Sequence, residues 1–223
     1  MLATFVIEIC LLVFSALKYK ISVIRGIGIA ILFFLATFQI SEYFVCGGWN
    51  MEAETWSRIG YVAITLLPML GIQLIGRIAP KLNRWWVRSA YVTGLGWAAL
   101  FAIGDIFRGY QCGGNYVIFQ LQPPVGGAYF LHYYAWLFIG IFLCFKLAKQ
   151  KGVRNNQRGA LHWLVAGYLV FLLPTTVVSS LYPETAQGIP SIMCGFAVIF
   201  AFILSLKILP LATKNTRKTS RKA

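Results

Sequence analysis

The sequence predicts an all-α polytopic integral membrane protein with seven transmembrane helices, and three observations support this fold class. Hydrophobic residues make up 59% of the 223 residues and charged residues only 12%, whereas soluble domains carry about 25% charged residues. The apolar residues gather in stretches of roughly 18–25 residues, which is the length that a helix needs to cross a bilayer. The basic residues lie almost entirely on one side of these stretches, as membrane topology requires.

Seven apolar segments follow one another along the chain, separated by short polar, glycine- or proline-containing breaks. They cover residues 2–17, 22–46, 57–78, 85–107, 129–148, 160–181 and 190–209. The first segment has no basic region before it and contains Glu8, so we interpret it as a retained anchor and not as a cleaved signal peptide. The predicted organisation is one transmembrane domain over residues 1–210 and a basic cytoplasmic tail over residues 211–223.

The positive charges predict the orientation. Of the 20 Lys and Arg residues, 18 fall in the loops after the first, third and fifth segments or towards the C-terminus, and only Arg58 and Arg108 fall on the other side. This bias predicts an outside N-terminus and an inside C-terminus in a plasma (inner) membrane. It also accounts for the net charge of +14 without a nucleic-acid partner. The expected partners are the lipid bilayer and a cytoplasmic protein.

Two of the five cysteines occur in similar surroundings at the outer ends of segments. The stretch SEYFVCGGWN contains Cys46, and GDIFRGYQCGGN contains Cys112. Because the outer side of the membrane is oxidising, a disulfide between them is favoured over two free thiols. A metal site is disfavoured, since neither stretch has a second Cys or His at ligand spacing. The bridge would fasten residues 108–128, which we expect to form a long outer loop of the kind that often binds or covers a site.

Polar residues from several segments are expected at one depth, just beneath the outer surface. An ionisable group within a spanning helix costs roughly 2.5–3.5 kcal/mol at the helix centre, so such groups are usually paired or functional. Gln39, Glu42 and Tyr43 share one face of the second helix. The other residues expected at this depth are Asp105, Arg108, His132, Tyr133 and Thr175.

We interpret these eight residues as the lining of an outward-opening ligand pocket. The alternative is structural packing, in which the aromatic residues belong to the membrane interface and Asp105 forms an i, i+3 ion pair with Arg108.

The sequence favours a binding function over an enzymatic one. It has no phosphate-binding glycine loop, nucleophile elbow or HExxH sequence, and its two histidines, His132 and His162, are expected at opposite faces of the bilayer. We therefore expect no cofactor and no metal. The leading hypothesis is a sensor- or receptor-like module that binds a small ligand from outside.

Two further functions stay open. The second hypothesis is a small-solute or ion-coupled transporter, for which intramembrane acids and the helix-interrupting Pro68 and Pro174 are suitable. The third is a membrane-embedded enzyme that uses carboxylates and His132 as acid–base groups.

The helix number, the outside N-terminus and the short loops give the chain a layout that resembles the seven-helix N-terminal membrane region of certain bacterial sensor histidine kinases. The resemblance covers most of the chain but includes no motif, and LATKNTRKTSRKA follows Pro210, so we expect no kinase domain in this sequence. It implies a stand-alone sensor-like module that acts through a separate partner. It assigns no role to any residue.

Overall fold

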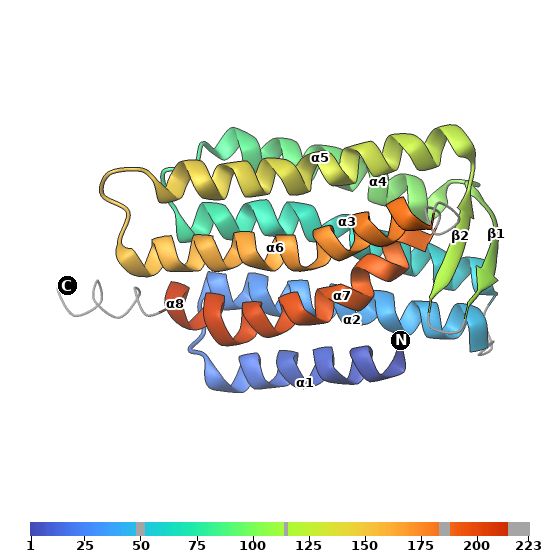
Figure 1. Cartoon of the computed structure of the whole chain (residues 1–223), viewed down its shortest axis with the longest axis horizontal. Coiled ribbons are helices and arrows are strands. Elements are labelled where there is room, and N and C mark those ends of the chain that lie inside the picture. Colours follow the sequence, from blue (N-terminus) through green and yellow to red (C-terminus); the bar gives the residue numbers. More distant parts are fainter. Residues whose placement is uncertain (48–51, 114–115, 183–187, 214–223) are drawn as a thin grey trace.

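The computed structural model describes residues 1–47, 52–113, 116–182 and 188–213. Long helices lie side by side along its longest axis, and a small β-hairpin crosses one end of the bundle (Figure 1). The elements in chain order are α1 (Leu2–Lys18), α2 (Val23–Gly47), α3 (Ala53–Ile78), α4 (Arg84–Ile103), β1 (Phe107–Cys112), β2 (Val117–Leu121), α5 (Pro123–Ala148), α6 (Asn155–Leu181), α7 (Ile189–Ile203), a π-helical turn (Leu204–Ile208) and α8 (Leu209–Thr213).

Within these described ranges, five helices are long and apolar enough to cross a membrane. They are α2, α3, α5, α6 and the continuous stretch Ile189–Thr213, which joins α7, the π-helical turn and α8. The predicted helical membrane-protein class is confirmed to this extent. The helices α1 and α4 have 17 and 20 residues, and both lie in the same bundle, where α1 packs against α2 and α4 packs against α3.

The helix ends differ from the predicted apolar segments where local chemistry extends or stops a helix. Helix α5 begins at Pro123 rather than near residue 129, because proline is well suited to the first helical position. Helix α4 ends at Ile103 because Gly104 adopts an extended conformation, so Phe107 lies in a strand and not in the helix. Pro174 lies inside α6, and the helix continues beyond it.

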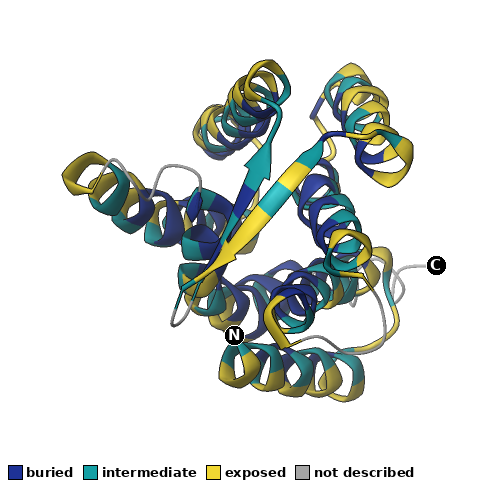
Figure 2. Cartoon of the chain, turned by 90° about the vertical axis from the view of Figure 1, so that its right-hand side faces the viewer, coloured by how far each residue is buried: buried dark blue, intermediate teal, exposed yellow. Residues whose placement is uncertain are grey.

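The outer loop expected at residues 108–128 is largely a β-hairpin, which corrects the sequence-based interpretation. Strands β1 and β2 pair antiparallel, with Cys112 opposite Val117. The side chains of Val117 and Phe119 are buried, whereas Ile118 and Gln120 are only partly covered. This alternation with a period of two residues is typical of a strand that covers a core with one face. Figure 2 shows the hairpin lying across the end of the bundle.

The predicted disulfide between Cys46 and Cys112 is confirmed. It joins the last turn of α2 to the end of β1, with the two Cα atoms 5.9 Å apart. The other three cysteines are free, and Cys144 and Cys194 are buried. The hairpin is therefore fastened covalently to α2.

Close contacts join α6 to α7 and α1 to the π-helical turn. A Cβ atom added to Gly167 on α6 would lie 2.5 Å from the Phe200 ring of α7, so this glycine permits the close approach of the two helices. Helix α1 is tied to the π-helical turn, since the Tyr19 hydroxyl donates a hydrogen bond of 2.6 Å to the Ser205 carbonyl. Large apolar side chains such as Leu131 and Leu173 are exposed, as expected for helices that face lipid.

Candidate ligand site beneath the hairpin

Two glutamates from neighbouring helices are buried near the hairpin end of the bundle. Glu8 on α1 is 0% exposed and Glu42 on α2 is 1% exposed. Within the part of the chain that the structure describes, neither carboxylate oxygen of Glu8 has a hydrogen-bond partner, and Oε1 of Glu42 has none. The two carboxyl groups lie near each other, and the α-amino group of Met1 is a positive charge near both. Such an arrangement is costly unless something else satisfies it.

Glu42 lies beside the serine that holds the hairpin. Ser191, in the first turn of α7, has its side chain near the Glu42 carboxyl group. The same Ser191 oxygen accepts a hydrogen bond of 3.1 Å from the backbone N–H of Val117 in β2. Ser191 therefore joins the inner strand of the hairpin to α7 at a point beside the buried Glu42.

Further polar side chains complete this buried site. Gln39 lies one turn before Glu42; its Oε1 accepts a hydrogen bond of 2.9 Å from the Thr4 hydroxyl, but its Nε2 has no partner among the described residues. The Tyr61 hydroxyl on α3 is buried, has no partner among the same residues, and lies near Glu42. Cys194 on α7 lies near both glutamates. We call this set the polar cluster: Glu8, Gln39, Glu42, Tyr61, Ser191 and Cys194.

The hairpin covers the polar cluster at one end of the bundle. The Phe119 ring of β2 packs against the Tyr61 ring, with the two centroids 5.2 Å apart, and against Phe38 of α2. Val117 and Phe119 are buried. The disulfide fixes β1 to α2 on one side, and Ser191 fixes β2 to α7 on the other. The hairpin therefore separates the cluster from the space beyond the end of the bundle.

A small cavity lies next to the cluster, deeper in the bundle, and shares Cys194 with it. The cavity measures about 30 Å³, is lined mainly by apolar side chains, and reaches Tyr133 of α5. A water molecule needs at least about 10–15 Å³ of such space. The cavity therefore has room for one or two water-sized groups.

The predicted pocket residues divide into two groups. Gln39 and Glu42 belong to the polar cluster, and Tyr133 is buried at the adjoining cavity. Thr175 is buried too, but its hydroxyl donates to the Phe171 carbonyl of its own helix. Tyr43 is 42% exposed. It belongs to the same broad face of α2 as Gln39 and Glu42, but it lies at the edge of that face and outside the cluster.

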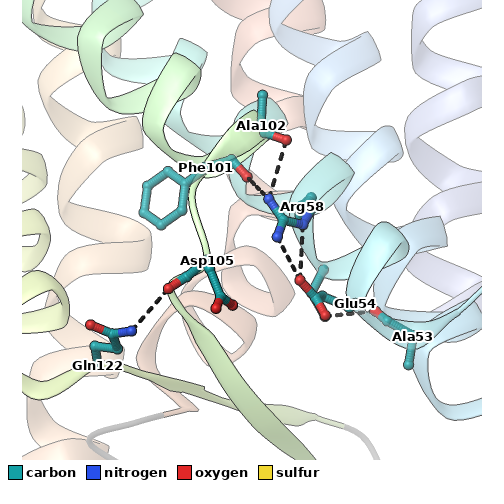
Figure 3. A network of polar contacts seen from close by, with 8 residues as sticks. Ala53, Glu54, Arg58, Phe101, Ala102, Asp105 and Gln122 are labelled. Atoms are coloured by element: carbon teal, nitrogen blue, oxygen red, sulfur yellow. Dashed lines mark hydrogen bonds and ion pairs between the residues drawn. The ribbon is translucent and has the colours of Figure 1, made fainter.

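Asp105, Arg108 and His132 also lie away from the cluster. The side chains of Asp105 and Arg108 are exposed, and the Asp105 backbone carbonyl accepts a hydrogen bond of 2.9 Å from the Gln122 amide (Figure 3). Because α4 ends at Ile103, Asp105 and Arg108 do not occupy successive turns of a helix, and the expected ion pair between them is not among the contacts of the described residues. His132 is half-buried beside the Trp97 ring, with centroids 5.9 Å apart.

A different ion pair strengthens this corner of the fold. Arg58 of α3 forms a salt bridge of 2.6 Å with Glu54 one turn earlier. Its guanidinium also donates to the backbone carbonyls of Phe101 and Ala102 at the end of α4 (Figure 3). Both partners of the salt bridge are at least partly exposed, so its role is to join α3 to α4 rather than to contribute to the polar cluster.

Four members of the polar cluster are absent from the predicted set of site residues: Glu8, Tyr61, Ser191 and Cys194. The signal for Glu8 is present, because it is the only charged residue between Leu2 and Leu17. Tyr61 and Ser191 carry no comparable signal, since tyrosine and serine are ordinary residues near helix ends in membranes. Their roles depend on how α3 and α7 are placed around α2.

The polar cluster offers a defined set of hydrogen-bonding groups. The carboxylates are acceptors, whereas the Gln39 amide and the Tyr61 hydroxyl supply donors. Among the described residues, no group of three His, Cys, Asp or Glu side chains is placed to hold a metal ion. A scan against protein-family models finds no match for this chain, and a search of curated proteins finds no matching sequence. The site chemistry is therefore the guide to function.

Proposed function

We propose that this chain is a sensor- or receptor-like membrane module that binds a small, cationic, hydrogen-bond-donating ligand at the polar cluster. The observation that supports this proposal is the pair of buried glutamates with unpartnered carboxylate oxygens. Buried polar groups nearly always have partners, and a ligand with positive charge and N–H or O–H donors would supply the missing ones. The close burial of Glu8 and Glu42 favours a small ligand.

The proposal includes seven membrane spans, an outside N-terminus and an inside C-terminus in a plasma (inner) membrane. A helix of 17 residues such as α1 measures about 26 Å, close to the hydrocarbon thickness of about 30 Å. Exposed apolar side chains on α1 and α4, including Leu17 and Val92, fit lipid contact. The start of α1 lies towards the hairpin end and α8 lies at the opposite end (Figure 1), which agrees with the orientation that the basic residues favour.

The position of Ser191 gives a reason to favour sensing. A ligand that takes the Glu42 carboxylate as its partner would act beside Ser191, which belongs to α7 and holds β2 through the Val117 N–H. Helix α7 continues through the π-helical turn to α8 at the other end of the bundle. Occupation of the cluster would therefore alter an element that reaches the opposite side of the membrane, where a cytoplasmic partner would detect it.

The enclosure of the glutamates supports ion-coupled transport as a second candidate. Carboxylates sealed within a bundle, near helices interrupted by Pro68 and Pro174, are suitable for a site that alternates between two sides of a membrane. The two candidates differ in one measurable property, because a transporter moves its ligand across a closed vesicle membrane and a receptor does not.

Ligand-dependent stability tests the proposal. Wild type, Glu42→Gln and the matched control Glu52→Gln, an exposed acid at the same end of the bundle, would be heated with ammonium, guanidinium and small primary amines. A ligand at 100 times its dissociation constant stabilises by about 2.7 kcal/mol, which raises the midpoint temperature by roughly 5–11 °C for a chain of this size. We expect this rise in wild type and Glu52→Gln but not in Glu42→Gln.

Equal behaviour of wild type and Glu42→Gln with every compound would reject the cluster as the ligand site. Uptake of the stabilising compound into proteoliposomes, abolished by Glu42→Gln, would replace the receptor with the transporter.

A further inference from the structure

A second cavity opens at the end of the bundle opposite the hairpin. It measures about 550 Å³ and lies between the start of α2, the end of α3, the loop before α6, and α8. This volume is within the range of about 300–1,000 Å³ that is typical of sites for small ligands. The polar cluster lies at the other end of the bundle, so the two sites are separate.

Three basic side chains line this cavity, and its described lining includes no acid. Arg77, Lys81 and Arg154 are among its lining residues, and none of the lining residues is an Asp or Glu. Among the described residues the salt bridge is the one between Arg58 and Glu54, so none of these three cations is neutralised by an ion pair there. Three unneutralised positive charges around one cavity favour an anion.

Backbone contacts fix the walls of the cavity. The Lys81 ammonium donates one hydrogen bond of 2.8 Å to the Lys151 carbonyl, which leaves its other two protons available. The Gln157 amide donates to the Ile78 carbonyl at 2.8 Å, and its oxygen accepts from the Arg154 backbone N–H at 3.1 Å. The end of α3 and the start of α6 are thus held together, with the basic side chains around the opening.

The remaining wall of the cavity is apolar. It includes Ile24 of α2, Ile78 of α3 and Ala212 of α8. The cavity has cations on one side and aliphatic side chains on the other. It therefore suits a molecule in which an anionic group is attached to an apolar or glyceryl part. The cavity also lies at helix ends, the level at which lipid headgroups meet a membrane protein.

We propose that this cavity binds a phosphate group, with Arg77, Lys81 and Arg154 as its ligands. Arginine presents several N–H donors in a geometry that matches phosphate oxygens, and lysine adds a compact charge. The phosphate is supplied by the headgroup of an anionic phospholipid or by a soluble phosphate compound. This inference goes beyond the proposed receptor function, because it concerns the other end of the bundle and is independent of the glutamates.

Two charge-matched variants separate this site from general attraction between a basic surface and anionic lipid. The test variant is Arg77→Gln with Lys81→Gln, which removes two lining charges. The control is Arg84→Gln with Arg88→Gln, which removes two exposed charges nearby on α4 that do not line the cavity. All four side chains are exposed, so folding is expected to be unaffected; unchanged far-UV circular dichroism checks this.

The lipid arm uses native mass spectrometry of protein released from nanodiscs of phosphatidylglycerol and phosphatidylcholine. The soluble arm measures thermal stabilisation by inorganic phosphate and by glycerol 3-phosphate. The loss of two charge-assisted contacts is expected to weaken binding more than about tenfold in the test variant and less than about twofold in the control. Retained phosphatidylglycerol identifies a lipid headgroup, and stabilisation by the soluble compounds alone identifies a free phosphate; either supports the site.

Equal loss of lipid and phosphate binding in the test and control variants would overturn the proposal, because binding would then follow total charge and not the cavity. Absence of binding in wild type, in both arms, would overturn it as well.

Discussion

The Cys46–Cys112 disulfide provides a prediction whose size follows from the chain. The two cysteines are 66 residues apart, and constraint of an unfolded loop of that length stabilises the folded state by about 4 kcal/mol in the chain-entropy model. Helices α3 and α4 lie between the cysteines, and any order that they keep in the unfolded state shortens the free loop. We therefore expect replacement of both cysteines by serine to lower the free energy of unfolding by about 2–4 kcal/mol.

The assay is equilibrium unfolding in mixed micelles, followed by far-UV circular dichroism and tryptophan fluorescence. Wild type under oxidising conditions would be compared with reduced wild type, with Cys46→Ser/Cys112→Ser, and with Cys10→Ser, which replaces a free exposed cysteine. We expect the reduced protein and the double variant to lose stability together, whereas Cys10→Ser behaves like the oxidised wild type. A difference below about 0.5 kcal/mol between oxidised and reduced protein would refute the reasoning that the bridge constrains the unfolded chain.

The remaining predictions concern the hairpin connection and helix packing. Ser191→Ala removes the acceptor of the buried Val117 N–H, which should lower the free energy of unfolding by about 1–3 kcal/mol. Hydrogen exchange at the Val117 amide should then accelerate. Unchanged protection of this amide would show that Ser191 does not hold the hairpin. Gly167→Ala places a Cβ 2.5 Å from the Phe200 ring and should destabilise by about 1–3 kcal/mol in the micelle assay. Gly195→Ala meets open space and should be neutral or slightly stabilising; equal effects of the two glycine variants would contradict the packing described for α6 and α7.

The bundle could be predicted from the sequence because its main signal is local. Apolar stretches of membrane length locate helices without knowledge of their partners. The disulfide was also predictable, since Cys46 and Cys112 follow apolar segments that end on the same side and occur in similar sequence surroundings. The hairpin was harder to predict, because the period-two pattern of Val117 and Phe119 covers only the five residues of β2. This pattern is followed by a proline-containing stretch that is also typical of a loop.

The candidate site was predictable only in part. Gln39 and Glu42 could be found because an acid and an amide are unusual in an apolar helix. Tyr43 shows the limit of that reasoning: helical spacing places residues on a broad face, but only the packing of α1, α3 and α7 around α2 decides which part of that face is buried. The contribution of Tyr61 and Ser191 likewise follows from tertiary arrangement, because residues distant in sequence meet at Glu42.

Native mass spectrometry of the protein, purified in mild detergent, tests most directly whether the polar cluster holds a small ligand. Wild type, Glu42→Gln and Glu52→Gln would be compared under identical conditions. The proposed function predicts a small molecule that stays with wild type and Glu52→Gln and is lost from Glu42→Gln, and its mass would identify it. Spectra in which all three proteins carry no small molecule, or carry the same one in equal amounts, would contradict a ligand site at Glu42 and would assign the glutamates a structural role.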